Sequence, residues 1–279
     1  MDKVAAAGFP YMLSVYRASL KASINQMLQY RFSILIWAVW GFVGPLISLA
    51  VWSAVTDSRG GSVVRQGASY TRADFAAYFL VFMIIGHLIM SWDAFEFAFR
   101  IRDGALSPRL LRPIHPIHTD VSYNLAFKLT TSAMLMPVWI LLFIALKPTP
   151  PASLGALALA VPAIVLAGIC RYIWQYALAV IAFWTTRVEA INQLYFMLDA
   201  FLGGRIAPLA LMPGLLGAVA LYSPFRSMGS FPVDLALGRL SGNEIATGFL
   251  LQIVWTTAGI VLFRRLWASG IRQYSAVGA

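Results

Sequence analysis

The chain has few charged residues for its length. Aspartate, glutamate, lysine and arginine make up 11% of the 279 residues, whereas about a quarter of an average soluble domain is charged. Hydrophobic residues make up 60% of the chain, so a soluble fold of this size would lack the polar surface needed to cover itself. The apolar residues form continuous runs rather than an alternating pattern, which excludes a membrane β-barrel and predicts an all-α integral membrane protein.

The chain has one cysteine and three histidines, which limits what it can bind. Cys170 lies inside an apolar run, and without a second cysteine no disulfide can form within the chain. His115 and His118 are three residues apart, but Pro116 lies between them and no cluster of carboxylates or thiolates accompanies them. A zinc site needs three or four ligands. The sequence therefore predicts no metal site.

Two enzyme motifs are also missing. The phosphate-binding pattern G-x-x-x-x-G-K-[ST] does not occur. No serine, histidine and aspartate follow the order of a hydrolase with a recognisable nucleophile turn. We therefore expect no catalytic residue and no ATPase site in this chain. If the protein does driven work, the energy enters through a partner.

The net charge of +10 raises the question of a nucleic-acid partner. Four arginines lie close together between residues 100 and 112, but no base-stacking platform of aromatic residues accompanies them. We expect no nucleic acid to bind. In a membrane protein, this charge indicates cytoplasmic loops that face anionic lipids.

Six apolar segments are candidates for spanning helices, which need about 20 residues each. They are residues 32–55, 75–99, 124–146, 154–185, 190–203 and 245–266, of which the fifth is short. An even number of spans places both termini on one side. Most of the 21 lysines and arginines fall on that side, which predicts cytoplasmic termini. No internal repeat or flexible linker is visible, so residues 1–279 are predicted to form one domain.

Residues 1–31 precede the first span and have the pattern of an amphipathic helix. Its apolar positions recur at helical spacing, and its polar positions fall on the opposite face. The apolar residues are Leu13, Tyr16, Leu20, Ile24, Met27 and Leu28, and the polar ones are Arg17, Lys21 and Asn25. This predicts a helix that lies in the inner membrane interface.

Residues 100–122 form the loop between the second and third spans. Asp103 and Gly104 mark a turn, after which Ser107 is predicted to cap a short helix that has Pro108 in its first turn. We expect Leu110 and Leu111 to give this helix an apolar face and Pro113 to end it. Exposed leucines flanked by arginines indicate a contact surface for another protein, or a helix that lies on lipid headgroups.

Residues 204–243 are too often interrupted to form a span. Proline breaks helices, and irregular backbone at membrane depth is tolerated only inside protein or beside a cavity. The interrupting residues include Gly204, Pro208, Pro213 and Pro224. We predict short re-entrant or interfacial helices on the outer side.

Ionisable residues inside spans are rare and need an explanation. Arg171 lies midway through the fourth span and Asp199 late in the fifth. If these spans pair antiparallel around Arg187, the two side chains lie within one helical turn, so we predict a structural ion pair. Glu96 and Arg100 are four residues apart and are predicted to pair along one helix.

Three stretches carry a resemblance to a known family. They are IRDGALSPRLLRPIHPIH; FWTTRVEAINQLYFMLDAFLGGRIAPLALMPGLLGAVALYSPF, with its G-x-x-x-P-x-x-x-x-P turn; and the tail FPVDLALGRLSG with RRLWASGIRQYSAVGA. With these, the chain resembles over essentially its whole length the permease subunits of type-2 ATP-binding cassette (ABC) transporters. It looks most like a poorly characterised bacterial branch whose members pair with a second permease and a separate ATPase.

The resemblance implies a function. The loop would contain a coupling helix that docks on the ATPase through Gly104, Leu106, Ser107, Arg109, Leu110, Leu111, Arg112 and Pro113. ATP and Mg²⁺ would be bound by that ATPase, and this chain would need no cofactor. It would form half of the pathway of an exporter in the bacterial inner membrane, with a second permease in a heterodimer rather than a homodimer.

Two other functions stay open. An ion-coupled secondary transporter would need inverted repeats and carboxylates at the centre of its spans, and neither is visible. A membrane scaffold or sensor that transports nothing would not need the broken segment 204–243. The apolar spans are compatible with lipids, drugs, peptides or glycans as substrates.

Overall fold

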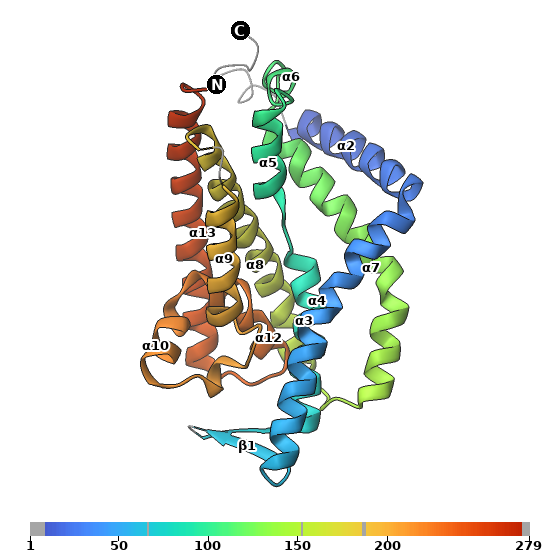
Figure 1. Cartoon of the computed structure of the whole chain (residues 1–279), viewed down its shortest axis with the longest axis vertical. Helices are drawn as coiled ribbons and strands as arrows, with labels where there is room; N and C mark the ends of the chain where they lie inside the picture. The colour runs from blue at the N-terminus through green and yellow to red at the C-terminus, as the bar shows by residue number, and fades with distance from the viewer. Residues whose placement is uncertain (1–8, 66, 152, 186–187, 275–279) are drawn as a thin grey trace.

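The computed structural model describes residues 9–65, 67–151, 153–185 and 188–274, which form a bundle of long helices (Figure 1). The helices are α2 (Phe9–Gln29), α3 (Arg31–Ser58), α4 (Arg72–Ile89), α5 (Asp93–Arg102), α6 (Ser107–Leu110), α7 (Pro116–Leu146), α8 (Leu154–Val180), α9 (Glu189–Leu202), α10 (Gly214–Tyr222), α11 (Pro224–Met228), α12 (Ser230–Ala236) and α13 (Gly242–Gly270). Two 3-10 helices, η1 (Ile181–Phe183) and η2 (Leu209–Leu211), and a hairpin of β1 (Ser62–Arg65) and β2 (Ala68–Thr71) complete the described part.

Five helical segments in the described residues are long and apolar enough to cross a membrane. They are Val39–Ser58, Arg72–Ile101, Pro116–Leu146, Leu154–Phe183 and Gly242–Gly270. The predicted all-α membrane class is therefore confirmed. The expected span at 190–203 is α9, whose 14 residues cover only about 21 Å at the helical rise. The number of six spans stays a prediction.

The long helices run up and down between two ends of the bundle (Figure 1). One end carries α6, α2 and the C-terminal end of α13, and we name it the α6 end. The other carries the β1–β2 hairpin and α10, and we name it the hairpin end. The chain runs through α9 from the α6 end toward the hairpin end and returns through α13 to the α6 end (Figure 1). Which end faces the cytoplasm stays a prediction.

The second predicted span is divided into α4 and α5. Met90 has an extended backbone (φ −60°, ψ 143°) and no proline lies nearby, so the break does not come from a local helix breaker. The side-chain amide of Asn124 on α7 donates to the Met90 carbonyl at 3.3 Å, and Ser91 donates to the Asp93 carboxylate at 2.7 Å. The Met90 carbonyl, which the break would leave unpaired in an apolar environment, is thus satisfied from α7, and Ser91 is satisfied by the first residue of α5.

The N-terminal helix α2 packs on α7. Met27 is 1% exposed and lies with Ile24 against Ala126 and Phe127. Its apolar face is therefore used at least partly by the protein itself, although the sequence had offered no partner for it. Leu13 and Leu28 on this helix remain exposed at 40% and 48%. The interfacial position of α2 stays a prediction.

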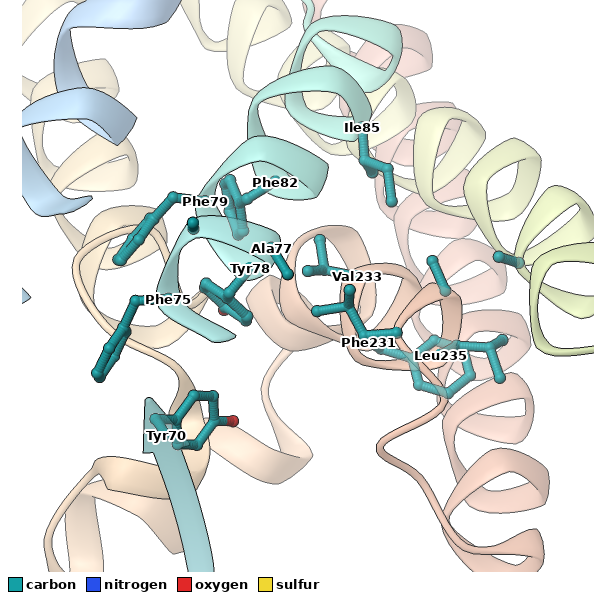
Figure 2. Close-up of a cluster of buried hydrophobic side chains, with 14 of the residues drawn as sticks. Tyr70, Phe75, Ala77, Tyr78, Phe79, Phe82, Ile85, Phe231, Val233 and Leu235 are labelled. Carbon is teal, nitrogen blue, oxygen red and sulfur yellow. The ribbon is translucent and has the colours of Figure 1, made fainter. Parts of the chain in front are cut away.

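The broken segment 204–243 turns back into the protein. Figure 2 shows Phe231, Val233 and Leu235 of α12 beside the aromatic side chains of α4, such as Phe82. Phe231 and Val233 are completely buried. Because α12 lies against α4 and α8, this part of the segment belongs to the core of the hairpin end.

Gly248 of α13 allows α12 to approach closely. A Cβ atom at this position would overlap the ring of Phe231. We expect Gly248→Ala to lower the free energy of unfolding by about 1–3 kcal/mol, since the two helices must separate. Gly242→Ala, at the open start of α13 with no atom within 4 Å, is the matched control and should change stability by less than about 0.5 kcal/mol. Equal thermal unfolding of both variants would contradict the close packing.

Candidate functional site

The loop 100–122 contains the short helix that the sequence predicts, with a different start. Gly104 turns the chain in the left-handed region (φ +70°), and α6 has four residues with Pro108 in its first turn. The N-cap is Leu106, with helical backbone angles, so the prediction of Ser107 as the cap is wrong. A side-chain cap needs an extended backbone, which the preceding turn does not leave. The Ser107 hydroxyl lies instead 2.8 Å from the hydroxyl of Tyr274.

The leucines of the loop do not share one face. Leu106 is completely buried, and Leu110 packs against the buried cluster around Phe97 and Tyr176. Leu111, by contrast, is 87% exposed. The expected common face of Leu110 and Leu111 is therefore wrong: one leucine fastens the loop to the bundle and the other points away from it.

The residues around Leu111 are exposed with it. Arg112 and Pro113 both lie on the surface, whereas Arg109 is half-buried. Residues 111–113 thus form a short, continuous exposed stretch of the loop. We name it the loop tip.

A buried carboxylate connects the loop to three helices. Asp120 of α7 is 2% exposed and accepts hydrogen bonds from Arg100 of α5 at 2.9 Å and from Arg109 of α6 at 2.7 Å. Its other oxygen accepts from the hydroxyl of Tyr176 on α8 at 2.9 Å. Charge-assisted bonds of this length are strong and directional. We name these four residues the Asp120 network.

The sequence does not predict the Asp120 network. It does predict the pair of Glu96 with Arg100, which the structure contains. Arg100 donates to Glu96 at 2.6 Å, four residues away. The available signal was charge balance: Asp120 and Asp103 are the only acidic residues among the arginines of the 100–122 loop. Because Asp103 is exposed, Asp120 is the loop carboxylate that compensates the half-buried Arg100 and Arg109.

The histidines of the loop have structural partners. The Nδ1 atom of His115 accepts the backbone N–H of Ile117 at 3.2 Å and so caps α7. Burial lowers the pKa of His115 to about 4, so its ring is neutral at physiological pH. The Nδ1 atom of His118 lies 2.8 Å from the hydroxyl of Tyr16 on α2. No group of three potential metal ligands occurs within the part of the chain that the structure describes.

The structure brings Arg171 and Asp199 together inside the bundle. The guanidinium of Arg171 donates to both carboxylate oxygens of Asp199, at 2.6 and 3.1 Å. Arg205, which the sequence did not indicate, donates from Nε to the same carboxylate at 2.6 Å. The side chains of Arg171 and Asp199 are at most 2% exposed, and that of Arg205 is 37% exposed. We name these three residues the Asp199 triad.

The glycine and prolines of the broken segment shape its turns. Gly204 has φ +84°, and a Cβ there would overlap the hydroxyl of Tyr78. That hydroxyl donates to the Gly204 carbonyl at 2.9 Å, which fixes the turn that brings Arg205 back to Asp199. The three prolines stand where helices begin: Pro208 before η2, Pro213 before α10, and Pro224 as the first residue of α11.

Comparison with known proteins identifies a family. Residues 42–278 match the family described as ABC-2 family transporter protein. The match begins within α3 and includes the loop, the Asp120 network, the Asp199 triad and the broken segment. Among curated proteins, no relative is found.

Proposed function

Because the chain belongs to the ABC-2 family of transporter proteins, we propose that it forms half of a translocation pathway and is moved by a separate ATPase that docks on the loop tip. The family makes the chain a membrane permease component of an ABC transporter. Docking at the loop tip rests on one observation: Leu111 is 87% exposed beside Leu110 and Arg109, which fasten the loop to the bundle.

The Asp120 network supplies a path for the motion. ATP and Mg²⁺ are bound by the ATPase, and closure of that subunit pushes on the loop tip. Arg109 is rigidly held by Asp120, which also holds Arg100 and Tyr176. A displacement of α6 is therefore passed to α5, α7 and α8 together, since charge-assisted bonds resist stretching.

The remaining parts of the proposal concern assembly. The chain works as an exporter in the bacterial inner membrane, with both termini and the α6 end in the cytoplasm. It pairs with a second permease, as a heterodimer rather than a homodimer, to complete the pathway. The left-handed turn at Gly104 supports docking because it directs the loop tip away from the bundle. Leu106 and Leu110 support it because they anchor the loop in the buried cluster.

Two of the buried carboxylates, Asp120 and Asp199, do not suit the role of a proton carrier. Asp120 and Asp199 each accept from two arginines. A proton carrier needs a carboxylate that is free to bind and release a proton. These two side chains are already engaged in ion pairs.

A pair of equally exposed leucines tests the docking proposal. We expect Leu111→Asp to lower the ATPase activity of the co-purified complex by about tenfold, the effect of losing ~1.4 kcal/mol of contact energy. Leu154→Asp is the control: Leu154 is 85% exposed, nearly as much as Leu111 at 87%, but it lies at the start of α8, at the hairpin end. The control should leave activity unchanged.

The substitution at Leu111 should not disturb folding, because the side chain contacts little of the protein. The same change at Leu110 would lower activity through lost folding as well as lost docking, since Leu110 packs against the buried cluster. Normal ATPase activity and normal recovery of the ATPase with Leu111→Asp would refute docking at the loop tip.

A further inference from the structure

A cavity of about 380 Å³ lies at the hairpin end, between β2, α10 and the region where α12 leads into α13. Its walls are largely apolar and include Met212, Leu221 and Leu240. Four charged residues also line it: Arg226, Asp234, Arg239 and Glu244. The cavity thus has apolar walls with two arginines and two carboxylates among them. It lies far from the loop tip.

Two of the four charged residues already have partners. Arg239 donates to Asp74 at 2.9 Å, and its guanidinium lies over the ring of Tyr70 at 4.1 Å. Glu244 accepts from the hydroxyl and the backbone N–H of Ser241, at 2.7 and 2.8 Å. These bonds hold the start of α4 and the start of α13 and leave little capacity for a ligand.

The other two charged residues have no ion-pair partner within the described residues. Arg226 is 7% exposed, and its guanidinium makes a single long hydrogen bond, at 3.5 Å, to the Leu221 carbonyl. The carboxylate of Asp234 makes no hydrogen bond or ion pair with the described chain, not even with Arg226 across the same cavity. The guanidinium of Arg226 also lies over the ring of Phe231, at 5.8 Å. A buried or partly buried charge without an ion-pair partner is nevertheless costly.

We propose that this cavity binds a zwitterionic group, with its phosphate or carboxylate on Arg226 and its ammonium on Asp234. The planar guanidinium suits a two-oxygen anion, and the carboxylate is the complement of an ammonium. A zwitterion satisfies both charges and leaves the cavity electrically unchanged. The apolar walls suit the carbon atoms that join or extend the two groups. This site is separate from the loop tip and does not rest on the proposed transport mechanism.

Phosphoethanolamine is the probe, because it carries an anionic phosphate and an ammonium in one small molecule. Titrated calorimetrically into the purified full chain in detergent, it should bind saturably. Inorganic phosphate alone and ethanolamine alone should each bind at least tenfold more weakly, because each satisfies one charge and leaves the other. Absence of saturable phosphoethanolamine binding would overturn the proposal, unless the lipid form described next binds. Equal binding of phosphate alone would overturn it as well.

Two arms separate a lipid source from a soluble one. In phosphatidylglycerol nanodiscs, addition of phosphatidylethanolamine should raise the thermal unfolding temperature if a lipid headgroup is the natural occupant. If only soluble phosphoethanolamine raises it, the occupant comes from solution. A rise with either supports the site, and no rise with both overturns it.

Variants locate the binding. Arg226→Gln and Asp234→Asn should each weaken phosphoethanolamine binding at least tenfold. Arg65→Gln is the matched control, because Arg65 is an exposed arginine on β1 at the same end of the bundle, and it should bind like the unaltered chain. Circular dichroism and size-exclusion chromatography check folding. Unchanged binding in both cavity variants would overturn the assignment even though the unaltered chain binds.

The pH dependence adds a second readout. Burial raises the pKa of Asp234 to about 7. The groups that face it are Arg226, Arg239, Glu244 and Tyr78, together with Tyr70, whose pKa is raised to about 12. Since an ammonium binds the ionised carboxylate, affinity should be higher at pH 8 than at pH 6. Asp234→Asn should reduce this dependence to the part that the second ionisation of the phosphate, with a pKa of about 6, contributes, and an undiminished dependence would contradict the role of Asp234.

Discussion

Asp199→Asn is expected to lower the free energy of unfolding by about 3–5 kcal/mol, the cost of removing one partner of a buried ion pair. The substitution leaves the Arg171 guanidinium without a carboxylate at a position where both side chains are at most 2% exposed. It also removes the partner of Arg205. Thermal or denaturant unfolding of the purified chain in detergent measures the effect.

A double substitution separates the unpaired charge from lost packing. In Arg171→Met with Asp199→Asn, no buried charge is left unpaired, so stability should partly return relative to Asp199→Asn alone. Arg205→Gln should cost less than about 1 kcal/mol, because the Arg205 side chain is 37% exposed. A double variant that is no more stable than Asp199→Asn would contradict the charge explanation.

Exchanging the two charges would be a poor test of the ion pair. With arginine at 199 and aspartate at 171, the new arginine would face Arg205, which lies 2.6 Å from the present carboxylate. The exchange would therefore restore one contact and create a repulsion. Its failure would not show that Arg171 and Asp199 are unpaired.

The pairing of Arg171 with Asp199 was accessible from sequence because it needs only two ingredients. Charged residues inside apolar runs need a partner of opposite charge. In two antiparallel helices, residues that are equally far along the chain from the connection lie side by side. Arg205 was not accessible in this way, because it follows the Gly204 turn (φ +84°), which reverses the chain. Turn geometry of this kind depends on contacts such as Tyr78 with the Gly204 carbonyl.

The class of the fold was accessible for a similar reason, whereas the interruptions of its helices were not. Composition and run length predict long apolar helices, and these are present. The break at Met90 is stabilised by Asn124 from another helix, so no local pattern marks it. The burial of α12 depends on the absence of a side chain at Gly248 of α13. The sequence around α12 does not contain this glycine, so it cannot predict the contact.

The second large effect is expected at Asp120, where a neutral substitution should uncouple the loop from the bundle. Asp120→Asn removes the charge that compensates Arg100 and Arg109, whose nitrogens lie 2.9 and 2.7 Å from the same carboxylate oxygen. Arg100 keeps Glu96, but Arg109 keeps no carboxylate among the described residues. We expect a loss of about 2–4 kcal/mol in stability, typical of a broken buried charge network.

The functional result follows from what the network joins. With Asp120 neutral, α6 still presents Leu111, so the ATPase should still co-purify with the chain. Substrate transport for each ATP hydrolysed should fall at least tenfold, since the loop tip no longer moves α5, α7 and α8 together. Asp103→Asn is the matched control, because Asp103 is an exposed carboxylate of the same loop and should leave coupling unchanged.

Temperature distinguishes lost coupling from lost folding. Asp120→Asn measured well below its own unfolding temperature should remain uncoupled, whereas a protein that is merely less stable should transport normally there. Tyr176→Phe removes only the neutral donor at 2.9 Å and should reduce coupling less than Asp120→Asn, because neutral hydrogen bonds are weaker than charge-assisted ones. Full coupling in Asp120→Asn at low temperature would show that motion enters the bundle by another route than the Asp120 network.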